Sequence, residues 1–150
     1  MSTRKTLLIT APGSRRHSLL AAHLREKGFS AEVSPAVFVR SEESLPADYD
    51  RAARNRQLGY DLTRGEIGCF LAHRAVWRSV AETEGPCMVL EDDARLSPAF
   101  SPTALRELAD VIADTNLIIR LFSQRKPPAR IWRELPSGLS IDRPAKAGYS

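Results

Sequence analysis

Residues 62–93 constrain the fold more than any other stretch, because they predict a long capped helix followed directly by a buried strand. Thr63 and Glu66 have the spacing of a capping box, in which each side chain satisfies a free backbone amide of the helix. The helix is expected to stop near Gly85, which is followed by proline. Residues 87–90 are continuously apolar, as in a strand that is covered on both faces. This combination favours an α/β fold.

The predicted helix has one broad apolar arc, because successive residues are about 100° apart around its axis. Glu66, Cys69 and His73 fall inside that arc, so we expect them on the buried side, where charged groups need partners. The alternative is that Glu66 is only a cap and His73 a histidine of the core. Cys69 and His73 are four residues apart and could ligate a metal, but two ligands alone make a poor zinc site. The apolar members of the arc are Ile67, Phe70, Leu71, Trp77, Val80 and Ala81.

Three consecutive acids, Glu91, Asp92 and Asp93, follow the predicted strand. Ligands bind open α/β sheets outside the carboxyl ends of the strands, which is where this sequence places them. Adjacent carboxylates repel one another unless solvent or a cation relieves the repulsion. Hard cations such as Mg²⁺ and Mn²⁺ prefer carboxylate oxygens. The triplet therefore predicts a cation site, with a solvated turn as the alternative.

Two runs, LTRGEIGCFLAHRAVW at residues 62–77 and MVLEDDARLSPAF at residues 88–100, resemble glycosyltransferase family 25, the lipooligosaccharide galactosyltransferases and their relatives. Gly-Glu-Ile-Gly-Cys, His73, Trp77 and Leu-Glu-Asp-Asp stand in the family's order and spacing. The resemblance extends more loosely over most of the chain. It implies a Rossmann-like GT-A type α/β fold, with a mainly parallel sheet and helices on both faces. It also implies transfer of a hexose, galactose, from a UDP-sugar to a glycolipid or oligosaccharide acceptor of the lipooligosaccharide or lipopolysaccharide core, with Mn²⁺ or Mg²⁺ as cofactor.

The resemblance also implies roles for individual residues. Glu91 and Asp93 are expected to hold the metal, with Asp93 as the closest ligand. No general base is assigned. The remaining candidates are expected to contact the donor: Arg15, Glu66, His73 and Asp92. Family members extend well beyond the equivalent of Ser150, so the chain is expected to be the N-terminal part of the family domain. The alternative is a catalytically incomplete relative that binds nucleotide-sugar or a partner protein without turnover.

The rest of the chain alternates predicted strands and helices. Residues 1–122 are expected to form the donor-binding α/β domain, and residues 123–150 a basic segment of the same domain that contains proline and glycine. Pro35 predicts an edge or irregular position for the second strand. The expected elements are a strand at 6–11, a helix from the cap Ser14 to Lys27, a strand at 32–39, a loop with a short helix at 41–61, a helix at 103–114 and a strand at 116–122.

The net charge of +4 is concentrated at the C-terminal end, where residues 120–150 hold seven basic and two acidic side chains. This predicts an anionic partner, either phosphorylated glycolipid, a membrane surface or nucleic acid, with a solvated end as the alternative. Nucleic acid is not expected, because residues 123–150 contain only two aromatic residues, Trp132 and Tyr149. The apolar run near the N-terminus is too short for a secretory signal, and two cysteines do not make a disulfide framework. We therefore expect a cytoplasmic protein that associates peripherally with the inner face of the membrane through the basic segment.

Overall fold

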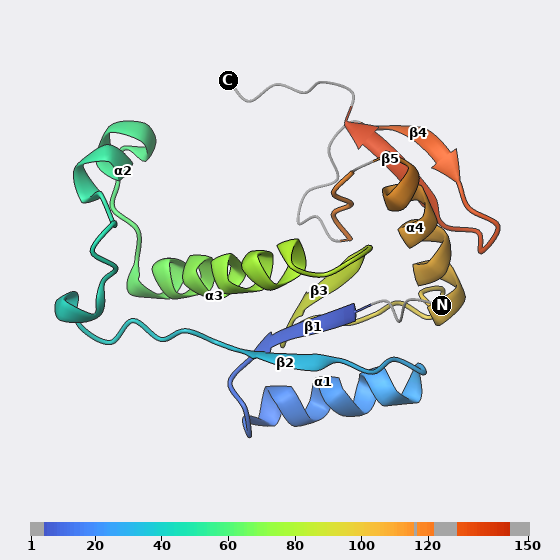
Figure 1. Cartoon of the computed structure of the whole chain (residues 1–150), viewed down its shortest axis with the longest axis horizontal. Helices are drawn as coiled ribbons and strands as arrows, with labels where there is room; N and C mark the ends of the chain where they lie inside the picture. The colour runs from blue at the N-terminus through green and yellow to red at the C-terminus, as the bar shows by residue number, and fades with distance from the viewer. Residues whose placement is uncertain (1–4, 116, 122–128, 145–150) are drawn as a thin grey trace. The chain divides into compact units, whose positions relative to one another are not determined.

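The computed structural model describes residues 5–115, 117–121 and 129–144, which form the elements labelled in Figure 1. The chain divides into two compact units. The first unit comprises the residues up to 22 together with residues 31–94, and the second comprises residues 23–30 together with those from 95 onward. The expected distinction between residues 1–122 and the basic segment stays a prediction.

A three-stranded parallel sheet in the order β2-β1-β3 forms the centre of the first unit. Its central strand is buried from Thr6 to Thr10, as expected for a strand covered on both faces. The strands are β1 (Lys5–Thr10), β2 (Glu32–Pro35) and β3 (Cys87–Glu91). The predicted α/β class with parallel pairing is confirmed and is consistent with a Rossmann-like fold, whereas a complete GT-A fold stays a prediction.

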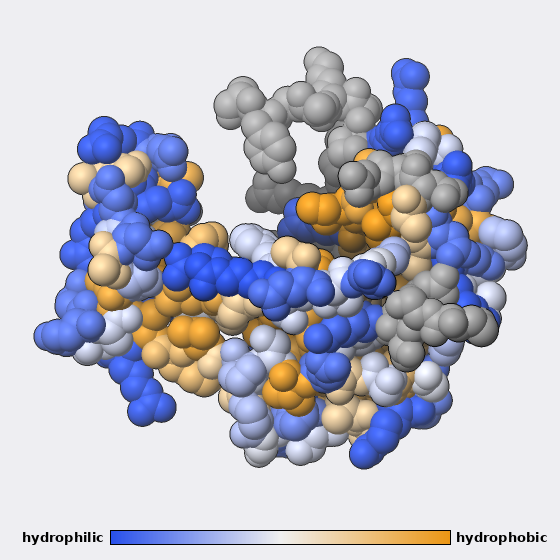
Figure 2. Space-filling view, in the orientation of Figure 1, coloured by the Kyte–Doolittle hydropathy of each residue, from blue (hydrophilic) through white to orange (hydrophobic). Residues whose placement is uncertain are grey.

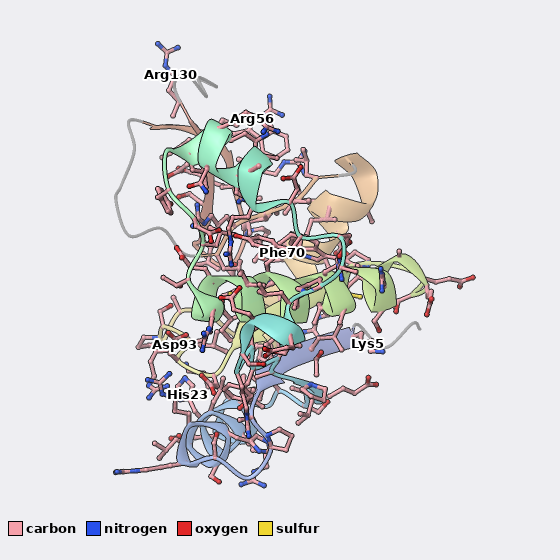
Figure 3. All side chains as sticks on the ribbon, turned by 90° about the vertical axis from the view of Figure 1, so that its left-hand side faces the viewer. Lys5, His23, Arg56, Phe70, Asp93 and Arg130 are labelled. Carbon is pink, nitrogen blue, oxygen red and sulfur yellow. The ribbon has the colours of Figure 1, made fainter. Side chains whose placement is uncertain are left out.

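Helices lie on the two sides of this sheet. α3 (Arg64–Ala81) packs on one side, and the first turns of α1 (Arg15–Glu26) lie on the other (Figures 1 and 3). The hydroxyl of Ser14 accepts a hydrogen bond from His17 N at 3.1 Å, so the predicted cap of α1 is confirmed. The core between β1 and α3 is made by Leu7, Ile9, Ala72 and Val76.

The buried face of α3 differs from the one that its apolar spacing predicts. Phe70 and Trp77 are 49% and 55% exposed, and Phe70 lies about 160° around the helix from the buried Ala72. Figure 2 shows hydrophobic surface in this part of the first unit. The buried side uses smaller residues because the helix lies against backbone: a Cβ on Gly68 would stand 2.4 Å from the carbonyl oxygen of Val37. Glu66, Cys69 and Ala81, which were expected on the buried side, are also exposed, and His73 is half-buried.

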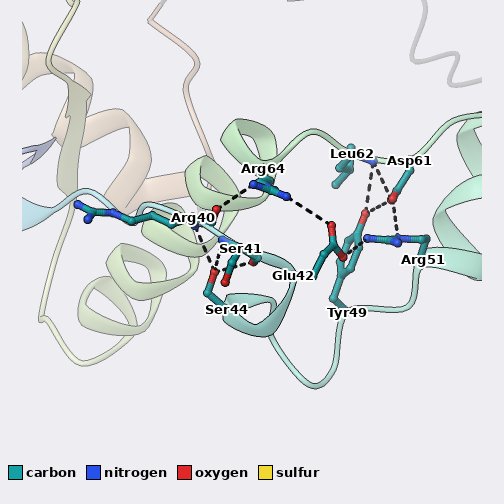
Figure 4. A network of polar contacts seen from close by, with 9 residues as sticks. All are labelled: Arg40, Ser41, Glu42, Ser44, Tyr49, Arg51, Asp61, Leu62 and Arg64. Atoms are coloured by element: carbon teal, nitrogen blue, oxygen red, sulfur yellow. Dashed lines mark hydrogen bonds and ion pairs between the residues drawn. The ribbon is translucent and has the colours of Figure 1, made fainter.

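The connection from β2 to α3 contains a single-turn helix η1 (Glu42–Ser44) and α2 (Arg51–Leu58), as the expected loop and short helix predict. Arg51 bridges Glu42 and Asp61 with ion pairs of 2.7 and 2.6 Å, and Tyr49 donates to Asp61 (Figure 4). β2 is an edge strand, as Pro35 predicts, but it ends at that residue rather than at residue 39. The chain leaves the sheet here to pass Gly68 of α3.

The second unit contains α4 (Pro102–Thr115) and an antiparallel pair, β4 (Ala129–Glu134) and β5 (Ser140–Pro144). The predicted helix at 103–114 is confirmed. The strand predicted at 116–122 is wrong for residues 117–121, which form no ladder and leave Ile118 99% exposed, since an apolar run becomes a strand only where another strand pairs with it. The pair β4-β5 was not predicted. None of the helices in the described ranges is long and apolar enough to cross a bilayer.

Candidate functional site

The acidic triplet lies at the carboxyl end of β3. Glu91 is the last residue of the strand, and Asp92 and Asp93 form the turn that follows, which is closed by a hydrogen bond from Ala94 N to the Glu91 carbonyl at 3.0 Å. Figure 3 labels Asp93 in this turn. Because β1 and β3 are parallel, the carboxyl end of β1 at Thr10 lies at the same edge of the sheet. The predicted position of the triplet is therefore confirmed.

Asp92 is held by the neighbouring strand. Its carboxylate accepts a hydrogen bond from Thr10 Oγ1 at 3.1 Å, and its side chain is only 22% exposed. Arg16 Nη1 lies 3.7 Å from the same carboxylate. Arg15, the arginine expected to contact the donor, is exposed, and its side chain makes no polar contact with another described residue, so its role stays a prediction. Thr10 and Arg16 therefore belong to the site through their contacts with Asp92. The contact of Thr10 depends on the pairing of β1 with β3, which the sequence alone does not show.

Glu91 lies on another side of the turn and contacts α3. Its carboxylate is 3.3 Å from His73 Nε2 and 4.0 Å from Cys69 Sγ. The three ligand atoms all lie within 4.8 Å of one another, which makes a group able to hold a metal ion. Cys69 and His73 therefore have the third ligand that the helix spacing alone did not provide. The signal in the sequence was a Cys/His pair at i and i+4 on a helix that feeds a strand ending in an acid.

The surroundings of Cys69 change the pKa of its thiol. Burial, followed by the charges of Glu91 and Asp93, raises its pKa above the ordinary value for cysteine. Without a cation the thiol is therefore protonated at neutral pH, which limits the negative charge that gathers at the end of β3.

Glu66 has a structural role in the described chain. Its carboxylate accepts hydrogen bonds from Thr63 N and Thr63 Oγ1, both at 2.8 Å, and Thr63 Oγ1 accepts from Glu66 N at 3.2 Å. These bonds lower the pKa of Glu66. The capping box is confirmed, and contact of Glu66 or His73 with a donor stays a prediction.

The residues expected to hold a divalent cation fit such an ion in their chemistry. Glu91 and Asp93 are exposed and offer the carboxylate oxygens that Mg²⁺ and Mn²⁺ prefer. Asp92 is already engaged with Thr10, so it is suited to fixing the turn rather than to supplying a free ligand. Glu91 also belongs to the mixed thiol, imidazole and carboxylate group, whereas Asp93 does not.

The described part of the basic segment is organised around one aromatic side chain. The guanidinium groups of Arg133 and Arg143 lie 5.2 and 4.3 Å from the ring centroid of Trp132. Arg133 lies on β4 and Arg143 on β5, so arginines from both strands contact the same ring. The predicted anionic partner of this segment stays a prediction.

Comparisons with known proteins show which family the chain is similar to. The family model described as "Glycosyltransferase family 25 (LPS biosynthesis protein)" matches residues 7–128. A mouse protein, "Inactive glycosyltransferase 25 family member 3", is 33% identical over 145 residues, covering 91% of this chain and 24% of the mouse protein. A Drosophila pseudoobscura protein, "Glycosyltransferase 25 family member", is 44% identical over 136 residues, covering 83% of this chain and 20% of the fly protein.

A shorter match relates part of the chain to a protein that is named as an enzyme. Human "Procollagen galactosyltransferase 2" is 46% identical over 57 residues, which is 37% of this chain and 9% of the human protein. The chain thus spans about a quarter or less of the length of these relatives.

Proposed function

The chain belongs to glycosyltransferase family 25, and from that premise we propose that it takes part in transfer of a hexose, galactose, from a UDP-sugar to a glycolipid or oligosaccharide acceptor. The description of the family as lipopolysaccharide biosynthesis proteins supports an acceptor of the lipopolysaccharide core. The name of the human relative supports galactose as the sugar. Both assignments belong to our proposal.

One observation carries the proposal: exposed carboxylates follow β3 at the edge of the sheet where β1 also ends. Breaking the bond between a sugar and a diphosphate places negative charge on the leaving group. A divalent cation, when bound, would neutralise that charge. Glu91 and Asp93 would hold the cation. Asp92, fixed by Thr10, would keep the turn in place, and the guanidinium of Arg16 beside it would attract the anionic donor.

Titration of the full chain with UDP, with and without Mn²⁺, tests the proposal. We expect Mn²⁺ to strengthen binding of UDP and Asp93→Ala to weaken the Mn²⁺-dependent part at least tenfold. Glu84→Ala is the matched control, because it removes an exposed carboxylate from the turn before β3, at the opposite end of the strand. Binding of UDP that ignores Mn²⁺, or equal effects of the two variants, would contradict metal-dependent donor binding.

A second function, binding of nucleotide-sugar without turnover, is favoured by the mouse relative, which is named inactive. The two functions differ in what happens to labelled UDP-galactose in the presence of lipopolysaccharide core oligosaccharide. Release of UDP with label in the oligosaccharide supports the transferase. Binding of the donor with no transfer and no hydrolysis supports the incomplete relative.

A further inference from the structure

We propose that Cys69, His73 and Glu91 form a binding site for a borderline divalent cation of the zinc class, separate in its ligand chemistry from the carboxylate site for Mg²⁺ or Mn²⁺. The site joins two elements. Cys69 and His73 are four residues apart on α3, and Glu91 is the last residue of β3. The proposal does not depend on sugar transfer.

The distances between ligand atoms are close to those of a tetrahedral zinc site. With metal–ligand bonds of roughly 2.0–2.3 Å, tetrahedral geometry places a nitrogen and an oxygen about 3.3 Å apart, and a sulfur about 3.6 Å from either. His73 Nε2 and Glu91 Oε1 are already 3.3 Å apart. Cys69 Sγ is 4.0 Å from Glu91 Oε2. Small side-chain rotations would therefore bring all three ligands onto one ion.

The fold makes these three residues neighbours independently of any ion. α3 is fixed against β1 by Ala72 and Val76, and β3 pairs with β1 so that Ile9 lies opposite Glu91. The capping box of Thr63 and Glu66 fixes where the helix begins. A site whose ligands are already gathered pays less ordering entropy on binding than one assembled from mobile loops.

The donor set determines which ion is expected. Thiolate and imidazole favour zinc and its neighbours over Mg²⁺ and Mn²⁺, which are bound mainly through oxygen. Three protein ligands leave a fourth position for water or another ligand, as in catalytic rather than structural zinc sites. Cys69 and Glu91 are exposed, so an ion can reach them from solvent. When the ion binds, the thiol releases its proton to solvent and coordinates as thiolate.

Titration of the full chain with Co²⁺, under reducing conditions, tests the site, because a cysteine thiolate bound to Co²⁺ gives a ligand-to-metal charge-transfer absorption. We expect this absorption in the unaltered chain and its displacement by Zn²⁺. Cys69→Ser should abolish it, and His73→Gln and Glu91→Gln should each weaken Co²⁺ binding at least about tenfold. Cys87→Ser is the matched control and should keep the absorption, since the thiol of Cys87 lies at the other end of β3, near the Gly85 carbonyl.

Circular dichroism of each variant shows whether it has folded, and if Cys69→Ser does not fold, His73→Gln and Glu91→Gln decide the outcome. Absence of a thiolate absorption in the unaltered chain at stoichiometric Co²⁺ would overturn the proposal. So would retention of the absorption in folded Cys69→Ser, or unchanged affinity in folded His73→Gln and Glu91→Gln.

The same variants separate this site from metal-dependent binding of UDP. Glu91 is common to both, so Glu91→Gln should impair both and does not distinguish them. Asp93→Ala should keep the cobalt absorption and lose the Mn²⁺-dependent part of UDP binding, whereas Cys69→Ser should do the reverse. Failure of the cobalt experiment with intact Mn²⁺-dependent UDP binding would overturn the zinc-class site alone, and the opposite result would overturn the donor site alone.

Discussion

At the scale of single residues, the three consecutive acids lie in different surroundings. Glu91 approaches α3, Asp92 is held at the end of β1, and Asp93 is exposed in the turn. Three identical charges in a row would repel one another if all were confined together. Their different surroundings reduce that repulsion, and the carboxylates of Glu91 and Asp93 stay available to a cation. Thr10 is the residue that makes this division possible, because its hydroxyl fixes Asp92.

Thr10→Val should therefore destabilise the chain and loosen the acidic turn. Thr10 is 1% exposed, and valine has nearly the same shape but cannot donate to the Asp92 carboxylate. We expect a loss of about 1 kcal/mol in the free energy of unfolding, measured by chemical denaturation. Thr6→Val is the control, because Thr6 is buried on the same strand and its side chain makes no hydrogen bond to another described residue. Equal effects of the two substitutions would show that the bond to Asp92 contributes nothing.

The thiol of Cys87 should react only at a raised pH. Burial is the largest influence on its pKa and raises it, while the nearby charge of Lys5 opposes the shift less strongly. In Cys69→Ser, Cys87 is the only cysteine left, so the pH dependence of alkylation reports on it alone. We expect the midpoint of the rate to lie above that of the same chain in denaturant. The sign follows because the folded state favours the neutral thiol, and a midpoint at or below the denatured value would contradict it.

At the scale of elements, α3 shows why the ends of a helix are easier to predict than its buried face. The cap at Thr63 and Glu66 is a local pattern, so the start of the helix could be predicted from spacing. The buried face depends on what the helix packs against. Here it packs against backbone near Val37, so Gly68 and small or β-branched side chains face inward and Phe70 and Trp77 face outward.

Gly68→Ala tests this account of α3 directly. The added methyl group would stand 2.4 Å from the Val37 carbonyl oxygen, which is too short for any real contact, so helix or connection must shift. We expect a loss of about 1–3 kcal/mol in the free energy of unfolding. Gly65→Ala is the matched control in the same helix. Its nearest neighbour would be Thr63 Oγ1 at 3.9 Å, so alanine should be neutral or stabilise by about 0.5–1 kcal/mol. A neutral Gly68→Ala would contradict the close approach.

At the scale of the whole molecule, the parts that could be predicted are those that local sequence specifies. β1, α1, β3, α4 and the acidic triplet all follow from caps, apolar runs and breakers. The β4-β5 pair could not be predicted in this way, because its buried residues, Leu135 and Ile141, are few and stand among arginines. The mixed group of Cys69, His73 and Glu91 was missed because two of its ligands come from a helix and the third from a strand.

The turn between β4 and β5 has a local sequence pattern that is easily overlooked in a segment rich in proline and basic residues. Leu135 N donates to the Leu139 carbonyl at 2.8 Å, and Gly138 adopts a φ of 83° that side chains other than glycine rarely accept. Pro136-Ser137-Gly138 is therefore a turn between strands rather than part of an irregular tail. The basic charge of residues 120–150 is thus carried in part by an ordered pair of strands.

Because these charges are concentrated, the chain should bind anionic membranes in a salt-dependent way. Each Lys or Arg near an anionic surface contributes roughly 1 kcal/mol, so Arg125→Ser with Lys126→Ser should weaken binding to vesicles of anionic lipid about tenfold or more. Arg56→Ser with Arg78→Ser is the control, because it removes the same charge from exposed positions on α2 and α3 and should weaken binding much less. Co-sedimentation with vesicles over a range of salt concentrations measures both. Three outcomes would contradict attraction through this segment: equal binding to zwitterionic lipid, binding that does not fall as salt rises, and an equal loss of binding in the two double variants. Charge localised in this segment predicts the opposite of each.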